Sequence, residues 1–486
     1  MKSCVKRSLI PILILLFSFP VMSFGQDFQH FLDRVNSLPD SLRQTVTDSL
    51  MNAVTTVPLI EQDTVVHFVY RGSASTLTLA GDVNNWSVTA LSMIHVGGTN
   101  FWHVDQVYPT DARLEYKYVI NGSNWILDPR NPNQVMEGFG PNSELRMPAY
   151  VSPPEITYYP DIPHGTSVDT TWYSTNLSNS RKIEIYLPAG YSTSSDSFPV
   201  IYFQDGSEAV SLENGENVID YLTAHKMIRP IIAVFVSYVN RTPEYAGNQV
   251  TSYMNFFVNE LVPFVDSRFR TLKSSHDRGV IGASYGGNIS LWLGMTYPSV
   301  FGNIGAQSSY VDPTISSTFQ SGSKLDLKLY MDLGTYDITS LIPMVHSFLQ
   351  IVKDKGYEYE YHEYNEGHSW ANWRAHIKNA LELFYPPLPA GVKKTSPKST
   401  GYYLNQNFPN PFNPSTVISY QLSANSYVSL RVYDILGREV ETIVEARQPA
   451  GSHMVRFDGT SLAGGVYICC LTADGRSDIT KMIMLK

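Results

Sequence analysis

Residues 278–293 read RGVIGASYGGNISLWL, a short apolar strand pattern that passes through a glycine-rich turn into an apolar helix pattern. The turn holds a Gly-x-Ser-x-Gly motif, with Ser284 between Gly282 and Gly286. Glycines two residues to either side suit a sharp strand-to-helix turn, because side chains there would crowd the serine. This setting predicts an exposed Ser284 nucleophile, with the Tyr285 N–H as an oxyanion donor. The alternative is an ordinary glycine turn between a strand and a helix, with no catalytic role.

Around this turn, residues 165–386 alternate apolar strand patterns with amphipathic helix patterns. Strands are predicted at KIEIYLP, FPVIYFQ, PIIAVFVSY, RGVIGA, FGNIGAQS, LKLYMDLG and YEYEYHEY. Helices are predicted between them at 216–227, 252–266, 287–297, 340–355 and 371–384. This alternation indicates an α/β domain with a largely parallel sheet, whose site should lie beyond the carboxyl ends of the strands.

A serine nucleophile needs a base, and the base needs a carboxylate that orients it. On an α/β-hydrolase sheet these groups follow in the order serine, acid, histidine. Asp337 follows the strand LKLYMDLG and His368 follows YEYEYHEY, so both are expected on loops at the carboxyl edge. We predict Asp337 as the acid and His368 as the base, with Gly367 allowing its loop to turn back over the sheet.

Other acids and histidines of this region stay open as alternatives. Asp332 lies inside a predicted strand and is interpreted as structural, whereas Glu363 or Glu366 could take the role of the acid. Three more histidines lie within predicted helices or strands and are interpreted as structural: His346, His362 and His376.

Two more loops at the carboxyl edge carry candidate site residues. The second oxyanion donor is expected after FPVIYFQ, from a backbone N–H of Gly206 or Ser207. Arg241 and Glu244 in NRTPEY either bind polar groups of a substrate or pair with each other. Trp370, two residues after His368, is a further candidate for substrate binding.

Residues 165–386 resemble the esterase family that includes enterochelin, feruloyl and acetylxylan esterases, S-formylglutathione hydrolases and mycolyltransferases. The resemblance rests on IYLPAGY, VIYFQDG, NRTPEY, GASYGG, YPSVFG, LGTYD and EGHSWANWR. It implies an α/β-hydrolase fold in which Ser284 is the nucleophile, Asp337 the acid and His368 the base. It implies no metal and no cofactor, and the substrates of the family are too varied to carry over.

Residues 61–150 place strand-like runs such as TVVHFVY and LEYKYVI between turn clusters, which predicts a small β-sandwich. The segment resembles the early-set modules of glycogen-branching enzymes and AMP-activated kinase β-subunits, in AGDVNNW, LEYKYVINGSNWILDP and GPNSEL. The resemblance implies a carbohydrate-binding module whose sugar contacts are Trp86, Lys117, Trp125 and Asn142. The alternative is a module that packs on the catalytic domain and binds nothing.

Residues 401–486 form a second all-β segment, after a Pro/Lys/Ser-rich linker at 387–400. They resemble the type A sorting domain of type IX secretion cargo, in NQNFPNPFNPSTVISYQL, VYDILGREV, AGSHMVRFDG, LAGGVYICCL and KMIMLK. The resemblance implies the type IX secretion machinery as a partner, followed by release or attachment at the cell surface.

The amino terminus has the pattern of a cleaved secretory signal over residues 1–25, with basic residues before an apolar run. That run is too short to span a bilayer, so no transmembrane segment is expected after cleavage. Residues 26–60 predict a short helical segment, broken at Pro39. Only Cys469 and Cys470 then remain, so no disulfide framework is expected. Without CxxC or HExxH motifs, the usual zinc signals are also absent.

Composition narrows the class of protein. The 486 residues carry a formal net charge of −9, which argues against a nucleic-acid partner. A hydrophobic share of 43% with 16% charged residues excludes a disordered chain. The sequence therefore predicts an α/β-hydrolase domain flanked by two β-sandwiches, acting as a secreted or cell-surface serine esterase on a carbohydrate-linked or siderophore ester. The alternatives are an acyltransferase of the same fold and a non-catalytic glucan-binding protein.

Overall fold

A computed structural model describes residues 28–387 and 402–485, except 406, 408, 409, 423, 474 and 475. These residues form two compact units, which divide between residues 390 and 391. The signal sequence predicted at 1–25 and residues 388–400 of the predicted linker lie outside the described residues. Among the described residues, no helix is long and apolar enough to cross a membrane.

The first unit begins with two helices, α1 (Phe28–Ser37) and α2 (Asp40–Ala53), which are separated at Pro39. Proline fixes its own φ and disfavours helix at the preceding residue, so the chain turns there. The apolar face of α1 packs with Val69 and Phe101 of the neighbouring sheet. The helices thereby cover one side of the strands that follow.

Residues 59–146, called the N-terminal module below, form two antiparallel sheets. The first has the order β1 (Leu59–Glu61), β2 (Val65–Arg71), β5 (Phe101–Val107) and β4 (Ile94–His95). The second has the order β3 (Leu77–Gly81), β6 (Arg113–Ile120), β9 (Gly140–Arg146) and β8 (Gln134–Glu137), with β7 (Asn124–Ile126) paired to β6. One apolar core, which includes Phe68, Leu79 and Leu114, draws side chains from both sheets.

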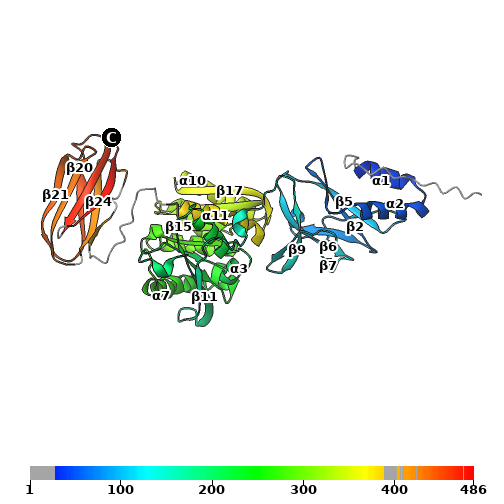
Figure 1. The fold of residues 1–486 in the computed structure, drawn as a ribbon, viewed down its shortest axis with the longest axis horizontal. Helices are drawn as coiled ribbons and strands as arrows, with labels where there is room; N and C mark the ends of the chain where they lie inside the picture. Colours follow the sequence, from blue (N-terminus) through cyan, green and yellow to red (C-terminus); the bar gives the residue numbers. More distant parts are fainter. Residues whose placement is uncertain are drawn as a thin grey trace, which may run out of the picture. The chain divides into compact units, whose positions relative to one another are not determined.

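Residues 166–384, called the α/β domain below, are built on one eight-stranded sheet, which Figure 1 draws in colours from turquoise through green to yellow. Its strands, in spatial order, are β10 (Thr166–Ser174), β11 (Asn179–Leu187), β13 (Ile232–Val236), β12 (Val200–Phe203), β14 (Arg278–Ala283), β15 (Asn303–Gln307), β16 (Lys328–Tyr336) and β17 (Glu358–Gly367). β10, β11 and β13 pair antiparallel and the remaining pairs are parallel. All seven predicted strands are present. The polar edge strand β10 was not predicted.

The helices of the α/β domain follow the strands in the alternation that the sequence predicts. They are α3 (Gly206–Ser211), α4 (Gly215–Ala224), α5 (Arg241–Ala246), α6 (Val250–Phe256), α7 (Val262–Arg268), α8 (Tyr285–Thr296), α9 (Pro313–Ser321), α10 (Leu341–Asp354) and α11 (Trp370–Phe384). The helix predicted at 252–266 is divided by a π-helical turn, Phe257–Leu261, which lies just before Pro263. Proline lacks the N–H that a regular helix would use there. Short 3₁₀ turns occur at Asp82–Asn84, Pro154–Ile156, Tyr191–Thr193 and Ser275–Asp277.

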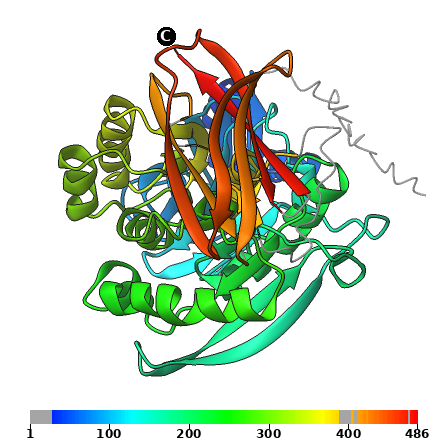
Figure 2. The same cartoon turned by 90° about the vertical axis from the view of Figure 1, so that its left-hand side faces the viewer.

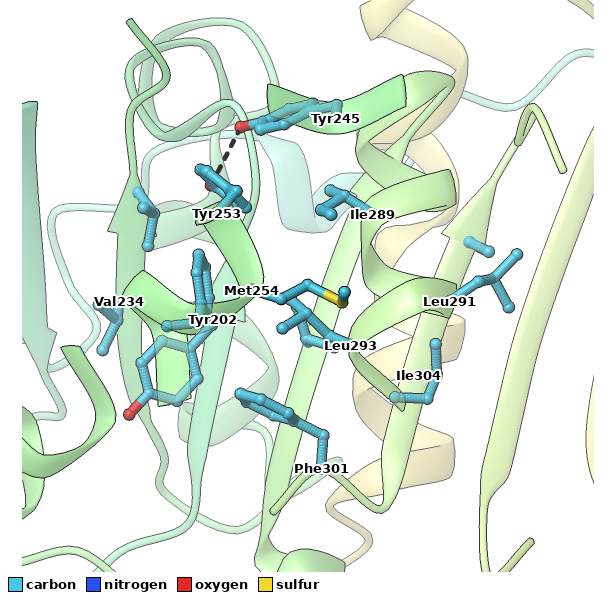
Figure 3. Close-up of a cluster of buried hydrophobic side chains, with 14 of the residues drawn as sticks. Tyr202, Val234, Tyr245, Tyr253, Met254, Ile289, Leu291, Leu293, Phe301 and Ile304 are labelled. Carbon is cyan, nitrogen blue, oxygen red and sulfur yellow. Dashed lines mark hydrogen bonds between the residues drawn. The ribbon is translucent and has the colours of Figure 1, made fainter. Parts of the chain in front are cut away.

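Figure 3 shows the core beneath the Gly-x-Ser-x-Gly turn, where apolar side chains of α8 face those of α6 and the sheet. Its polar members hold the loop that follows β12. The Tyr253 hydroxyl donates a hydrogen bond to Gln204 Oε1 at 2.7 Å, and the backbone N–H of Asp205 donates to the Tyr245 hydroxyl at 3.0 Å. The two tyrosine hydroxyls are themselves joined, as the dashed line in Figure 3 marks. The core therefore fixes the position of the loop at Asp205.

The second unit also consists of two antiparallel sheets, drawn in orange and red in Figure 2. One has the order β18 (Tyr402–Leu404), β19 (Ser415–Leu422) and β22 (Gly451–Asp458). The other has the order β21 (Glu439–Gln448), β20 (Ser426–Asp434), β23 (Gly465–Ala473) and β24 (Arg476–Met484). A shared apolar core includes Ile418, Leu430 and Cys469. Cys469 and Cys470 are free thiols.

Candidate active site

Ser284 lies in the strained turn between β14 and α8, with φ +57° and ψ −120°. A positive φ is uncommon for a residue with a side chain, and such strain collects at functional sites. The flanking glycines are required by close packing. A Cβ on Gly282 would lie 2.7 Å from the backbone of Gly286, and a Cβ on Gly286 would lie 3.0 Å from Asp205 Oδ2. Side chains at these two positions would therefore be crowded, but by Gly286, Gln204 and Asp205 and not by the serine as expected above.

Asp337 and His368 lie directly after β16 and β17 and contact each other. His368 Nδ1 is 2.7 Å from Asp337 Oδ1, and that carboxylate is 2% exposed. A buried carboxylate at Nδ1 favours the imidazole tautomer that leaves Nε2 free to accept a proton. The Trp373 ring system and the imidazole pack at right angles, with 5.0 Å between the ring centroids. Ser284 and His368 line the same cavity, which has a volume of about 820 Å³.

The alternative acids have other partners. Glu363 lies 2.7 Å from His346, and Glu366 lies 2.8 Å from His376. Asp332 is buried inside the sheet and accepts hydrogen bonds from Gln307, Ser308 and Tyr330. Burial raises the pKa of Asp332 to about 6. Of these carboxylates, only that of Asp337 is hydrogen-bonded to His368 in the described structure.

Arg241 joins the two loops that carry the candidate oxyanion donors. Its Nε and Nη2 donate to the two carboxylate oxygens of Asp205 at 2.7 and 2.8 Å, and Nη2 also donates to the Ala283 carbonyl at 3.2 Å. Asp205 precedes Gly206, where a Cβ would lie 2.5 Å from the backbone of β13. Arg241 thus ties the Gly206 loop to the strand that leads into Ser284, and it borders the cavity.

Glu244 was expected either to bind a substrate or to pair with Arg241, and both expectations were wrong. Glu244 is fully buried and pairs with Arg181 of β11, at 3.0 Å from Nη1 and 3.1 Å from Nη2. Its carboxylate also accepts the backbone N–H groups of Val239 and Asn240. It therefore neither pairs with Arg241 nor borders the cavity. Its contacts are those of a residue that holds a loop in place.

The four residues of the predicted sugar-binding set all line the cavity that contains Ser284 and His368: Trp86, Lys117, Trp125 and Asn142. The rings of Trp86 and Trp125 stack with centroids 6.4 Å apart and an angle of 27°. Trp86 Nε1 donates to Asp82, and Asn142 Nδ2 donates to Glu115 at 2.8 Å. The module packs on the α/β domain, as the second alternative above had it. The sequence did not predict that the face with the four residues would border the cavity of Ser284.

The module holds the segment around His368 from one side. Gly367 is the last residue of β17, and a Cβ placed there would lie 2.1 Å from the carboxyl carbon of Asp82. The buried Arg113 of β6 pairs with Glu366 at 3.5 Å. Gly367 is therefore required by the close approach of the module. The turn that we predicted at this glycine was wrong, because the strand continues through it.

A second contact runs from the hairpin between β8 and β9. Both carboxylate oxygens of Glu137 accept backbone hydrogen bonds, from Trp370 at 3.0 Å and Ala371 at 3.2 Å. Trp370, the candidate for substrate binding, lines the cavity. The hairpin tip carries Phe139, a fully exposed side chain at the edge of the cavity. Sequence reasoning missed Phe139, although an aromatic residue between two turn glycines was a visible signal.

Residues 174–384 match the family described as Putative esterase, and residues 406–486 match the secretion system C-terminal sorting domain. The match to the Putative esterase family thus falls on the α/β domain. The sorting domain marks the chain as a secreted or cell-surface protein.

Three relatives show the range of this likeness. The uncharacterized protein YjcH of Bacillus subtilis is 29% identical over 235 residues, or 45% of this chain and 97% of that protein. The endo-1,4-beta-xylanase/feruloyl esterase of Xylanibacter ruminicola is 26% identical over 163 residues, 31% of this chain and 22% of that protein. The enterobactin esterase FES of Shigella flexneri matches in structure with a TM-score of 0.59 at 19% identity, over 69% of this chain and 97% of that chain. This last likeness shows a shared fold.

Proposed function

We propose that this chain is an exported serine esterase that cleaves carboxylic esters at Ser284. The observation that carries the proposal is the strained Ser284 turn opening on the same cavity as His368, whose Nδ1 is 2.7 Å from the buried Asp337 carboxylate. A nucleophile, a base and a group that orients the base are the parts that acyl transfer requires.

In the proposed reaction, His368 Nε2 accepts the hydroxyl proton while Ser284 Oγ attacks the ester carbonyl. The backbone N–H groups of Tyr285 and Gly206 would stabilise the negative charge on the carbonyl oxygen. His368 then donates its proton to the departing alcohol, which leaves an acyl group on Ser284. A water molecule, deprotonated by His368, releases the acid and restores the serine. Asp337 stabilises the imidazolium in both halves of the reaction.

The proposed substrate is an ester linked to a carbohydrate or a siderophore. The names of the Xylanibacter and Shigella relatives support both classes. The stacked pair Trp86 and Trp125 in the cavity favours the carbohydrate-linked class, because C–H groups of sugar rings pack on aromatic faces. In this proposal residues 61–150 are an early-set module of the carbohydrate-binding type, and residues 1–25 are a signal that is removed on export.

The test is hydrolysis of a panel of acetyl, feruloyl and enterobactin-like esters by the full chain and by Ser284→Ala. We expect turnover of at least one class, reduced by a factor of 10³ or more in Ser284→Ala. Hydrolysis that survives in the variant, or its absence from the whole panel, would contradict the proposal.

A further inference from the structure

We propose that the N-terminal module forms the wall of the active site that binds the alcohol half of the ester. The inference rests on the proposed function and goes further, because it assigns one half of the substrate to one part of the chain. In this proposal the module is part of the catalytic cavity. A separate sugar-binding module, by contrast, would only tether the enzyme to polysaccharide.

The orientation of the bound ester in the cavity follows from the chemistry of ester cleavage. The imidazole that accepts the serine proton must return it to the oxygen of the leaving alcohol. The alcohol half of the substrate therefore lies on the His368 side of the cavity. The module contacts the α/β domain in the segments next to Asp337 and next to His368.

Those contacts surround His368. Asp82 lies against Gly367, one residue before the histidine. The side chain of Asn85 donates to the Thr339 hydroxyl at 2.7 Å, two residues after Asp337. At the hairpin tip, a Cβ on Gly138 would lie 3.6 Å from Trp370 Nε1. Module residues thus border the leaving-group side of the cavity at several points.

The hairpin tip connects to the histidine through aromatic packing. The ring systems of Trp370 and Trp373 meet edge to face at 4.9 Å, and Trp373 packs in the same way on His368 at 5.0 Å. Phe139 follows Gly138 at this tip and borders the cavity. Phe139 and His368 therefore border the same cavity, and a chain of packed aromatic rings leads from the hairpin tip to the histidine.

The wall has the chemistry of a site for a hydroxyl-rich ring. Trp125 is 41% exposed and Phe139 is fully exposed, although both are large apolar side chains that gain from being covered. The carboxyl groups of Asp82 and Glu115 also border the cavity and can accept hydrogen bonds from hydroxyl groups. The occupant that fits this wall is therefore a sugar unit that carries the ester.

The opposite side of the cavity is left for the acyl half. Tyr238 donates its hydroxyl proton to Glu208 at 2.9 Å, and both border the cavity together with Arg241. These residues come from the α/β domain, at the end of the sheet that carries the Gly206 loop. Changes in the module should consequently act on the alcohol and leave the choice of acid unaffected.

The experiment compares two esters of one acid, the methyl ester and the 6-O-glucosyl ester, with acetic and ferulic acid run in parallel. For Trp125→Ala and Phe139→Ala in the full chain, we expect kcat/KM for the glucosyl ester to fall about tenfold. We expect kcat/KM for the methyl ester to change less than about twofold, because it does not reach the wall. Trp125→Phe, which keeps an aromatic face, should restore part of the loss.

The matched control is Tyr173→Ala, which removes an aromatic side chain that is 60% exposed on β10 and does not line the cavity. It should leave both esters unaffected. Equal losses on the two esters, or no loss on the glucosyl ester, would overturn the inference.

A binding measurement separates this inference from the proposed function. In the Ser284→Ala background, calorimetry should show the glucosyl ester binding about tenfold more weakly after Trp125→Ala. If the unmodified chain hydrolyses neither ester but this difference is found, the serine mechanism is wrong and the alcohol wall is supported. If hydrolysis is found without the difference, the wall is wrong and the serine mechanism stands.

Discussion

The carboxylate of Glu137 accepts a hydrogen bond from the backbone N–H of Trp370 at 3.0 Å, across 233 residues of sequence. Glu137 belongs to the N-terminal module, whereas Trp370 begins α11 and lies two residues after His368. Because the first N–H groups of a helix have no partner within the helix, this carboxylate satisfies donors that would otherwise be left free. The module therefore helps to position the segment that carries the proposed base.

Removing this carboxylate should lower the rate of the chemical step. We expect Glu137→Ala to lower kcat about tenfold on both the methyl and the glucosyl ester, with little change in KM, because a misplaced base slows proton transfer without weakening binding. Glu137→Gln keeps one acceptor oxygen and should recover part of kcat. Steady-state kinetics on the two esters checks this.

The control for Glu137 lies on the same strand. Met136→Ala removes a side chain that is 57% exposed on β8 and should leave kcat unchanged. A Glu137→Ala variant with unchanged kcat, or with a loss confined to KM, would show that the contact is only structural.

Arg241 is expected to support both stability and turnover. In Arg241→Met the buried Asp205 carboxylate loses its partner, which should cost about 3 kcal/mol in the free energy of unfolding. The same change releases the Gly206 loop from the Ala283 carbonyl, so kcat should also fall. Denaturant unfolding and ester kinetics measure the two effects.

A double variant distinguishes the two roles of Arg241. Asp205→Asn combined with Arg241→Met removes the unpaired charge and should recover much of the lost stability. It does not restore the tie between the loops, so kcat should stay low. Recovery of kcat together with stability would mean that Arg241 acts through folding alone.

Glu213 should make stability depend on pH. This carboxyl group is 5% exposed, and burial with further repulsion from Asp205 raises its pKa to about 8. The folded chain therefore holds a proton that the unfolded chain releases near its ordinary pKa of 4.5. The stabilisation is complete below pH 4.5, declines as pH rises, and is lost above about pH 8.

Glu213→Gln stays neutral at every pH and removes this dependence. The melting temperature of the variant, relative to the unmodified protein, should rise steadily between pH 5 and pH 8, which thermal unfolding can follow. Glu358→Gln, which changes an exposed carboxylate of β17, should run parallel to the unmodified protein. A parallel course for Glu213→Gln as well would mean that this carboxyl group is ionised in the folded chain.

The sequence predicted those parts of the structure that depend on residues close together in the chain. Ser284 could be placed because its glycines and its flanking strand and helix are adjacent in sequence. Asp337 and His368 could be placed because each directly follows a predicted strand in the parallel part of the sheet. Their contact at 2.7 Å then follows from the order of β16 and β17 in that sheet.

The parts that the sequence did not predict depend on distant packing. The partner of Glu244 in α5 is Arg181, 63 residues earlier on β11, and no local pattern distinguishes that pairing from one with Arg241. In the same way, the sequence indicated what Trp86 and Trp125 could bind but not that they border the cavity of Ser284. That placement depends on how the module packs on the α/β domain, through contacts such as Glu137 with Trp370.

The most direct test of the central claim is to trap the acyl group on the enzyme. The full chain is mixed with p-nitrophenyl acetate, quenched with acid within the first turnovers, digested and analysed by mass spectrometry. The account predicts a burst of p-nitrophenol and one acetyl group on the peptide that contains Ser284, with both lost in Ser284→Ala. Continued hydrolysis by Ser284→Ala, or an acetyl group found only on another residue, would contradict it.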